Sequence, residues 1–374
     1  MSNRYFAVCI AILVFTGWYL LQTDIEEYSP PEVTSEIATA PEPSVAEIEE
    51  APSDPIDEQA EASDEQAEAF QEEAGQSSMA SASGIVERDT DLTSPTAEAS
   101  SETVVQKDAT SKANLAQETG EFAENLCREI GNKLGSVDIS DCLAQELRAT
   151  KGKSAEGRDL AVKNYPPTDT REPLGKVLVI GGIHGDEFSS VSVVFKWMEI
   201  LNIHHSGLFD WRFIPASNPD GLLQSESQRQ NANGVDLNRN FPTADWDENA
   251  IDYWINKTDK RPRRYPGETA NSEPETQWLV AQIEDFKPDV IISMHAPYHL
   301  VDYDGPPGAP NQLGSLYLRQ LGVYPGSLGN YAGVDLKLPI VTVELASAGI
   351  MPNKEEISGM WDDLVGWLRT KLRE

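Results

Sequence analysis

The stretch VLVIGGIHGDE at residues 177–187 decides the predicted fold and marks one candidate site within it. Its apolar first part, residues 177–180, predicts a buried strand, and the glycine pair after it predicts a turn. His184 and Glu187 follow three residues apart, so both side chains can face one point beyond the sheet edge. Nitrogen and carboxylate ligands in this arrangement are typical of a catalytic zinc ion, which keeps one coordination position open for water.

Two later apolar runs end in side chains of the same kinds. Residues 289–294 precede His295, and residues 338–343 precede Glu344. The chain has only five histidines, and both His184 and His295 fall at predicted strand ends. Because ligands of open α/β sheets bind beyond the carboxyl ends of the strands, we expect these side chains to surround one site.

Helices are predicted between these strands by apolar periodicity and by end signals. The helix at residues 272–286 has a serine at its predicted cap and a proline in its first turn. Strands that alternate with helices predict an α/β fold with helices on both faces of the sheet. The predicted strands are 176–182, 211–215, 289–294 and 338–343, and the predicted helices are two short ones within 116–150, then 187–203, 272–286, 312–321 and 354–372.

The N-terminal end of the chain has the composition of a membrane anchor. Residues 5–21 contain no charged side chain and follow Arg4, and seventeen apolar residues are just enough to cross a bilayer as a helix. A cleaved signal peptide is the alternative, but no small-residue cleavage site follows. Trp18 and Tyr19 suit the membrane interface instead. We therefore expect an uncleaved anchor at residues 1–23, with the N-terminus in the cytoplasm.

Residues 24–115 form an acidic stretch with 24 acidic and three basic residues, which supplies most of the chain's net charge of −33. Such a segment buries too little apolar surface to offset its ordering entropy, so it is predicted to be a disordered linker. Its like charges favour an extended tether, with docking to a basic partner as the alternative. The negative charge argues against nucleic-acid binding. The folded domain is predicted at residues 116–374.

Cys127 and Cys142 are the only cysteines outside the predicted anchor. They lie fifteen residues apart in a segment expected beyond the membrane, where a disulfide is favoured over two buried free thiols. Neither belongs to a CxxC pair, so a zinc site built from thiolates is not expected.

A set of motifs follows in a fixed order along residues 155–372. After the HxxE pair come Asn-Pro-Asp-Gly at 218–221, GVDLNRNF at 234–241, the strand-end histidine and the strand-end glutamate. HxxE alone is weak evidence, but the ordered set resembles the zinc metallocarboxypeptidase family, the carboxypeptidase A-like enzymes. The resemblance implies a mixed, mostly parallel sheet of the zinc carboxypeptidase type.

The resemblance implies one Zn²⁺ per chain, bound by His184, Glu187 and His295. His299 competes with His295 for the third position, although it matches the family pattern less well. Asp186 is either a carboxylate that orients one of the ligands or a turn residue.

The resemblance also gives roles in hydrolysis to four residues. Glu344 is expected to be the general base, which takes a proton from the zinc-activated water and delivers it to the leaving amine. Arg239 and Asn238 are expected to bind the terminal carboxylate of the substrate, because a planar guanidinium pairs with a carboxylate through two hydrogen bonds. Arg229 is expected to stabilise the oxyanion, the alternative being a surface arginine in a loop.

Three further stretches resemble the murein peptide amidase group of this family: SEPET at 272–276, HAPYHLVDYDGP at 295–306 and YPGSLG at 324–329. That group cuts the bond between γ-D-glutamate and a terminal diaminopimelate in cell-wall peptides. The resemblance implies a murein peptide amidase. Together with the anchor predicted from residues 5–21, it leads us to expect the domain in the bacterial periplasm and the anchor in the inner membrane. Tyr324 and Tyr331 are both candidates for the tyrosine that covers the substrate in carboxypeptidase A-like enzymes.

Three alternatives stay open. A succinylglutamate desuccinylase or aspartoacylase-like deacylase also carries an HxxE pair, a later histidine and an Asp-Leu-Asn-Arg stretch. Such enzymes act on small cytosolic amino-acid derivatives, against which the predicted anchor argues. The second alternative is a carboxypeptidase that trims longer cell-wall peptides, and the third is a catalytically inactive wall-binding scaffold. The sequence does not give the oligomeric state.

Overall fold

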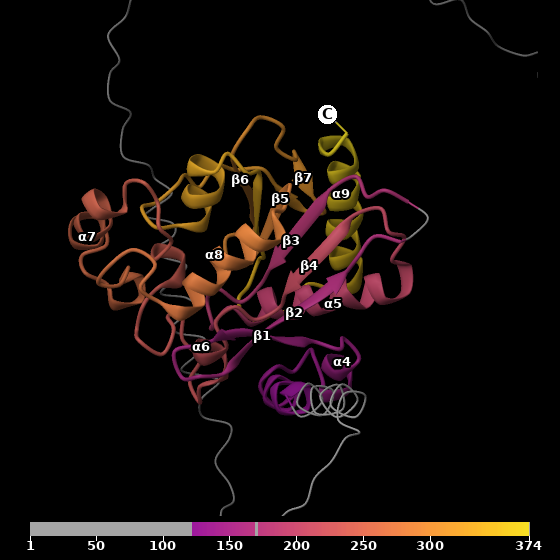
Figure 1. Ribbon diagram of the computed structural model, residues 1–374, viewed down its shortest axis with the longest axis horizontal. Coiled ribbons are helices and arrows are strands. Elements are labelled where there is room, and N and C mark those ends of the chain that lie inside the picture. The colour runs from indigo at the N-terminus through magenta and orange to yellow at the C-terminus, as the bar shows by residue number, and fades with distance from the viewer. Residues whose placement is uncertain (1–121, 169–170, 374) are drawn as a thin grey trace, which may run out of the picture. The chain divides into compact units, whose positions relative to one another are not determined.

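A seven-stranded sheet organises residues 122–168 and 171–373, the part of the chain that the computed structural model describes. In sheet order the strands are β1 (Arg148–Lys153), β2 (Asp159–Tyr165), β4 (Asp210–Ile214), β3 (Lys176–Ile180), β5 (Val290–His295), β9 (Ile340–Glu344) and β6 (Leu300–Asp304) (Figure 1). The four strands from β4 to β9 are parallel to one another, and β1, β2 and β6 are antiparallel to their neighbours. The predicted α/β fold with a mixed sheet is confirmed, with the parallel strands at its centre.

Helices cover both faces of the sheet, as expected. They are α5 (Phe188–His204) and α9 (Lys354–Lys371) on one face, and α8 (Pro274–Phe286) with the π-helix η3 (Gly329–Asp335) on the other. Successive side chains of a strand point to opposite faces. Val177 and Val179 of β3 therefore pack in the core beneath α5 and α9, whereas Leu178 and Ile180 pack in the core beneath α8. Burial on both faces explains why the central strands β3, β5 and β9 are mostly apolar.

Three strands of the sheet, β1, β2 and β6, lie outside the four strands predicted from the sequence. The two short helices predicted within 116–150 occupy residues 122–133 and α4 (Ile139–Leu143), but from Arg148 the chain continues as β1. Strand β1 is an edge strand with mostly exposed polar residues, so it lacks apolar alternation. Strand β6 is fully buried yet carries Asp302 and Asp304, and these carboxylates hide its strand character in the sequence.

Two helix predictions are corrected by the structure. Residues 312–321 form no helix but a small hairpin of β7 (Gln312–Leu313) and β8 (Leu316–Tyr317), which turns at Gly314 with a φ of 58°. Helix α8 has Glu273 rather than a serine as its cap residue. The hydroxyl of Ser272 donates to the Glu273 carboxylate over 2.7 Å and so makes no cap bond to the helix.

The predicted disulfide is confirmed. Cys127 and Cys142 are bonded, and both are fully buried. The bond joins the helix over residues 122–133 to α4, and this helical pair packs in the same apolar core as α5.

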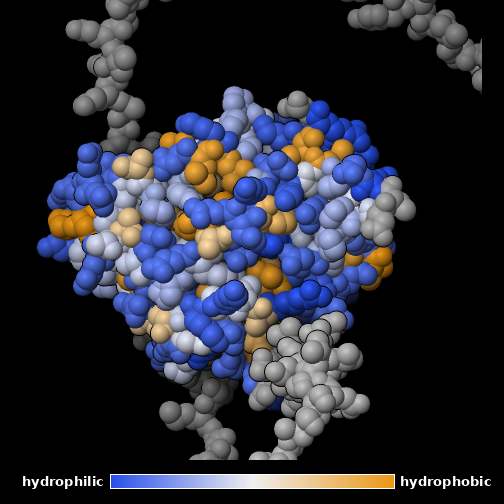
Figure 2. Space-filling model, in the orientation of Figure 1, coloured by the Kyte–Doolittle hydropathy of each residue, from blue (hydrophilic) through white to orange (hydrophobic). Residues whose placement is uncertain are grey.

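The predicted anchor at residues 1–23 and the predicted acidic linker at residues 24–115 lie outside the described residues. In the ranges 122–168 and 171–373, no helix has the length and apolar composition needed to cross a bilayer. The face of the domain in Figure 2 is mostly hydrophilic, and its apolar residues gather only in small scattered groups.

A long connection at residues 215–273 links β4 to α8 and folds beside the carboxyl end of β3. It contains α6 (Pro219–Leu223), η1 (Leu237–Arg239), α7 (Trp246–Asn256) and η2 (Pro262–Arg264). The Asn218 side chain donates to the carbonyls of Ile183 (3.3 Å) and Arg229 (3.1 Å), which fastens two loops together. Gly185 lies in this contact, where a Cβ atom would approach the main chain of Gly221 to 2.2 Å. Only glycine allows this close approach of the two loops.

Candidate active site

The carboxyl ends of three adjacent parallel strands meet at one edge of the sheet. His184 lies in the loop after β3, Glu187 immediately precedes α5, and His295 is the last residue of β5. Glu344 is the last residue of β9 and is paired with His295 in the strand register. The topology thus gathers residues that are far apart in the sequence.

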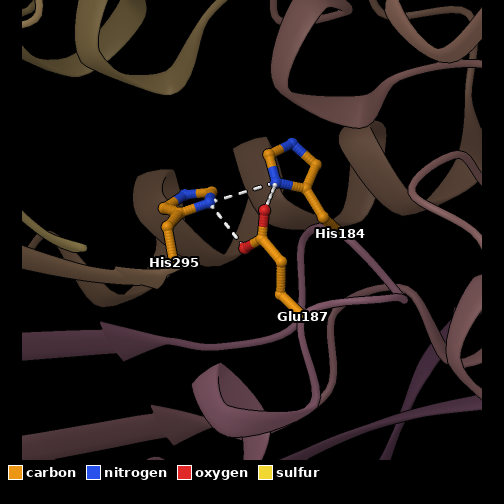
Figure 3. Close-up of side chains that lie close together, drawn as sticks. All are labelled: His184, Glu187 and His295. Atoms are coloured by element: carbon orange, nitrogen blue, oxygen red, sulfur yellow. Dashed lines mark hydrogen bonds and ion pairs between the residues drawn. The ribbon is translucent and has the colours of Figure 1, made fainter. Parts of the chain in front are cut away.

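His184, Glu187 and His295 form one buried cluster (Figure 3). The Nδ1 atom of His184 lies 2.7 Å from Oε1 of Glu187, and the Nδ1 atom of His295 lies 3.2 Å from Oε2 of the same carboxylate. The two Nδ1 atoms are 3.2 Å apart. One ligand atom from each residue lies within 4.8 Å of the others, so the three side chains could hold one metal ion.

The hydrogen-bond partners of the two Nε2 atoms, the ring nitrogens outside the cluster, make these histidines suitable metal ligands. Nε2 of His184 lies 3.2 Å from a carboxylate oxygen of Asp236, and Nε2 of His295 lies 3.0 Å from the hydroxyl of Ser293. With a metal ion bound, Nδ1 of His184 would present its lone pair to the metal and Nε2 would donate its hydrogen to the Asp236 carboxylate, a contact that orients a ligand histidine. Two imidazoles and one carboxylate facing one point fit a zinc ion of the catalytic type.

Charges near the cluster favour a cation in it. Burial alone raises the pKa of Glu187, but His184 and His295 outweigh burial and hold that pKa below its usual value. Burial likewise raises the pKa of Asp236, but Arg229 and His184 hold it well below the usual value. Both carboxyl groups are therefore ionised at neutral pH, and their negative charge stabilises a bound cation.

Asp236 connects the cluster to Arg229. Its fully buried carboxylate accepts from Nε of Arg229 over 2.9 Å, in addition to its contact with His184. Nη1 of Arg229 in turn lies 3.2 Å from Nδ1 of His184. Asp186, the predicted candidate for orienting a ligand, instead pairs with Arg263 over 2.6 Å. Asp236, rather than Asp186, contacts Nε2 of the candidate metal ligand His184. Asp236 lies in the GVDLNRNF motif, but the sequence pattern did not predict this contact.

Glu344 faces the same cavity with an unused acceptor. The residue is 6% exposed, and its Oε2 atom has no hydrogen-bond partner among the described residues. Burial raises the pKa of Glu344 well above its usual value, the charge of Glu187 raises it further, and the main-chain N–H of Tyr298 opposes the shift. A carboxyl group with a raised pKa is a stronger proton acceptor, which suits general base catalysis.

Asn238 and Arg239 lie on another wall of this cavity. Asp236 caps η1 by accepting from the main-chain N–H of Asn238 over 3.0 Å, which fixes both residues. The side-chain oxygen Oδ1 of Asn238 accepts a hydrogen bond from the main-chain N–H of Leu328 over 2.8 Å. The hydrogens of the Asn238 side-chain amide therefore remain for a ligand. The Arg239 guanidinium lies 4.5 Å above the Tyr324 ring, and its buried Nε has no partner among the described residues.

The cavity has a volume of about 300 Å³, and all seven predicted site residues line it. Tyr324 lines it as well, whereas Tyr331 is buried in the core and stacks on Phe241. The structure therefore favours Tyr324 over Tyr331 as the tyrosine beside the substrate. His299 is exposed in the turn between β5 and β6 and is not part of the cluster, so it does not replace His295.

Comparisons with known proteins identify the family. A family model described as zinc carboxypeptidase matches residues 147–305. Murein peptide amidase A of Escherichia coli (strain K12) is 33% identical over 174 residues, which cover 45% of this chain and 69% of that protein. Murein peptide amidase A of Vibrio campbellii is 32% identical over 204 residues, which cover 52% and 77%. The chain belongs to the zinc carboxypeptidase family.

The fold agrees with this assignment. The crystal structure of carboxypeptidase A from Helicoverpa armigera aligns with a TM-score of 0.50 at 16% identity, covering 72% of this chain and 81% of that one. The protein is thus a hydrolase of the zinc carboxypeptidase type, and the family implies zinc as the metal that its His-Glu-His cluster fits. Glu344 lies beyond the residues that the family model matches. The pairing of β9 with β5 places it beside His295.

Replacing Asp236 by Asn should weaken zinc binding by about 10- to 100-fold, because the outer nitrogen of His184 loses its charged partner. Competition with a chromogenic chelator measures the affinity. The matched control is Asp186→Asn, which removes a neighbouring carboxylate that pairs with Arg263 and contacts no ligand. Equal zinc affinities for the two variants would contradict the role given to Asp236.

Proposed function

We propose that this zinc carboxypeptidase is a murein peptide amidase that hydrolyses the bond between γ-D-glutamate and a C-terminal diaminopimelate. The observation that carries the proposal is the shared cavity: the candidate metal cluster, the unpartnered oxygen of Glu344 and the pair Asn238 and Arg239 all face it. A hydrolase needs these three elements around one scissile bond. The identity to two murein peptide amidases supports the choice of substrate.

Glu344 moves the protons of the proposed reaction. Its free Oε2 atom accepts a proton from the attacking water and then delivers it to the amine that leaves. One zinc ion per chain, held by His184, Glu187 and His295, would polarise the scissile carbonyl and lower the pKa of nearby water. Both functions need a site without bulk water, and all four side chains are at least nine-tenths buried.

Arg229 is assigned to the developing oxyanion. Asp236 accepts from its Nε atom, and its Nη1 atom lies at the cluster, 3.2 Å from Nδ1 of His184 and 3.6 Å from Oε1 of Glu187. A fixed guanidinium close to the reacting carbonyl stabilises negative charge that develops in the transition state. Because Asp236 contacts both Arg229 and His184, it positions the oxyanion donor relative to the metal ligand.

Arg239 is assigned to the terminal carboxylate of the substrate, together with the free amide hydrogens of Asn238. Changing Arg239 to Gln should lower kcat/KM by roughly 100- to 1,000-fold, because a buried charge pair with the substrate is lost. A substrate with an amidated C-terminus should lose a similar factor with the unchanged protein but little with the variant. An equal penalty for amidation in both proteins would contradict the assignment.

We further propose that the domain works in the bacterial periplasm, held to the inner membrane by residues 1–23 and separated from it by the acidic residues 24–115. The Cys127–Cys142 disulfide supports an oxidising compartment, since such bonds persist outside the cytosol. Murein peptides are present on that side of the membrane. Accessibility of the domain to protease in spheroplasts, compared with lysed cells, tests the topology.

A substrate panel tests the function against its alternatives. The purified chain is incubated with L-Ala-γ-D-Glu-diaminopimelate, with longer murein peptides, and with succinylglutamate and acetylaspartate. We expect the highest kcat/KM for the tripeptide. Preference for longer peptides would favour the wall-trimming carboxypeptidase, and preference for the acylated amino acids would favour the deacylase. Zinc binding without turnover of any substrate would support the scaffold.

A further inference from the structure

A basic stretch at residues 257–264 has no part in the proposed reaction. It carries five lysines and arginines and one aspartate, whereas residues 116–374 as a whole carry 25 basic and 38 acidic residues. The stretch follows α7 and includes η2. It is therefore a local concentration of positive charge on a domain whose net charge is negative.

The basic stretch is held in place by contacts on both of its sides. The Trp254 side chain of α7 donates from Nε1 to the carbonyl of Arg261 over 2.9 Å, and the Thr258 hydroxyl donates to the carbonyl of Trp254 over 2.7 Å. Arg263 pairs with Asp186 over 2.6 Å. The stretch is thus fixed beside the HxxE loop, which carries two of the candidate metal ligands.

The mouth of the catalytic cavity is positive as well. Arg264 of the basic stretch lines the cavity, and Arg319 lines it from the segment after β8. Of the charged residues that line the cavity, these two are the ones that are not buried, whereas its carboxylates are at most 9% exposed. Burial lowers the pKa of Arg239, Asp236 opposes this shift, and the charge of Arg264 lowers that pKa further. Arg264 therefore acts electrostatically on the residue assigned to the carboxylate of the substrate.

Three of these basic side chains keep a charge that the domain does not neutralise. Lys257, Lys260 and Arg319 are exposed, and their charged groups have no ion-pair partner among the described residues. Charges of one sign around a cavity attract ligands of the opposite sign. The surface formed by the basic stretch and Arg319 therefore fits a partner with several negative charges.

The chain itself contains a segment of this kind. Residues 54–73 of the predicted linker have nine acidic residues in twenty positions and no lysine or arginine. Residues 74–121 separate this segment from the described domain, and a chain of that length spans about 160 Å when fully extended. A domain of this size has a radius of gyration of about 18 Å, so the segment can reach any part of its surface. Because both partners belong to one chain, weak contacts are enough to populate the bound state.

An anionic bilayer fits the same surface less well. Asp247, Glu248 and Asp252 of α7 are exposed, and they lie within one short helix, about 16 Å long, of the basic stretch. A flat anionic surface that contacts the lysines would also approach these carboxylates, and like charges repel. A single acidic chain can contact the lysines and avoid the carboxylates.

We propose that residues 54–73 bind to the basic stretch and Arg319 and thereby compete with anionic substrates for the mouth of the cavity. The binding does not depend on the reaction, but its effect on activity rests on the proposed function, in which the substrate brings carboxylates to the same cavity. The bound segment raises KM and leaves kcat unchanged, because a saturating substrate displaces it. Salt screens exposed charges, so the effect should disappear at an ionic strength of about 0.5 M.

The test replaces the nine acidic residues of 54–73 by Asn or Gln in the full-length chain. The matched control replaces the nine acidic residues of 24–50, which removes the same charge from a part of the linker further from the domain. In neutral detergent at low salt, the first variant should have a KM for the murein tripeptide about 5- to 10-fold lower than that of the unchanged chain, with the same kcat. The control variant should keep the KM of the unchanged chain.

Changes on the domain complete a double-mutant cycle. In the Lys257→Gln/Lys260→Gln background, neutralising residues 54–73 should have little further effect on KM, because the two changes remove one interaction. In the control background Arg148→Gln/Lys151→Gln, which removes two exposed charges of β1, the linker change should keep its full effect.

A fluorescent peptide of residues 54–73 measures the binding without turnover. Its anisotropy should rise at low salt with the full-length chain whose own segment is neutralised, and the further change Lys257→Gln/Lys260→Gln should abolish the rise. Absence of binding would overturn the inference whatever the kinetics show. If none of these proteins hydrolyses the tripeptide, the proposed function fails, and the anisotropy still decides whether the segment binds.

Two kinetic results would also contradict the inference. Equal KM changes from the two linker variants would show general repulsion between linker and substrate rather than a bound segment. The other result is an effect of Lys257→Gln/Lys260→Gln only in vesicles that contain phosphatidylglycerol, with no effect of the linker change in neutral detergent. That result would assign the basic stretch to anionic lipid.

Discussion

Glu344→Gln should lower kcat by roughly three to four orders of magnitude and leave zinc bound, because an amide cannot accept the proton of the attacking water. The substitution keeps the size and shape of a side chain that is 6% exposed, so the fold should be retained. Steady-state kinetics on the murein tripeptide and metal analysis of the same sample measure both quantities.

The control for this prediction is Glu344→Asp, which keeps the carboxyl group but moves it by one methylene. We expect partial activity from this variant, well above that of the glutamine variant. Full activity of Glu344→Gln with zinc still bound would show that another residue moves the proton. Loss of zinc from Glu344→Gln would show instead that Glu344 belongs to the metal site.

His295→Asn should abolish stoichiometric zinc binding and activity together. His295 supplies one of the three ligand atoms that lie within 4.8 Å of one another, and the remaining two cannot complete a catalytic zinc site. We expect zinc affinity to fall by more than about 100-fold, beyond the loss typical of residues that only contact a ligand. Because zinc binds only the folded chain, its removal should also lower the thermal midpoint.

His299→Asn is the matched control, since the same substitution is made four residues later. His299 is exposed and has a positive φ of 55°, a conformation that asparagine tolerates well. We expect zinc content, activity and thermal midpoint to be unchanged. Zinc loss from the His299 variant, with retention in the His295 variant, would reverse the ligand assignment.

The central strands could be predicted because they are buried on both faces. Strands β3, β5 and β9 are mostly apolar and buried, and each ends near a polar residue that the chemistry requires. The edge strands could not be predicted in this way. Strand β1 is exposed and polar, and β6 carries aspartates whose positions are explained by the cavity rather than by the sheet.

The metal ligands could be proposed from the sequence because HxxE and a strand-end histidine form a recognisable pattern. The residues that contact these ligands could not be predicted. Their contacts join different loops, and the sequence does not specify the paths of those loops. Asp236 reaches His184 only because the connection after β4 folds beside the HxxE loop. The tyrosine beside the substrate was ambiguous for the same reason, since Tyr331 is withdrawn from the cavity only by its packing on Phe241.

The most direct test of the central claim is the release of diaminopimelate from L-Ala-γ-D-Glu-diaminopimelate by the purified chain. Mass spectrometry follows the product with and without a chelator, and metal analysis of the same preparation gives the zinc content. We predict about one zinc per chain and release that stops with the chelator and returns when zinc is restored. Release that persists in a metal-free sample would contradict the zinc mechanism. No release from a sample with one zinc per chain would contradict the murein substrate.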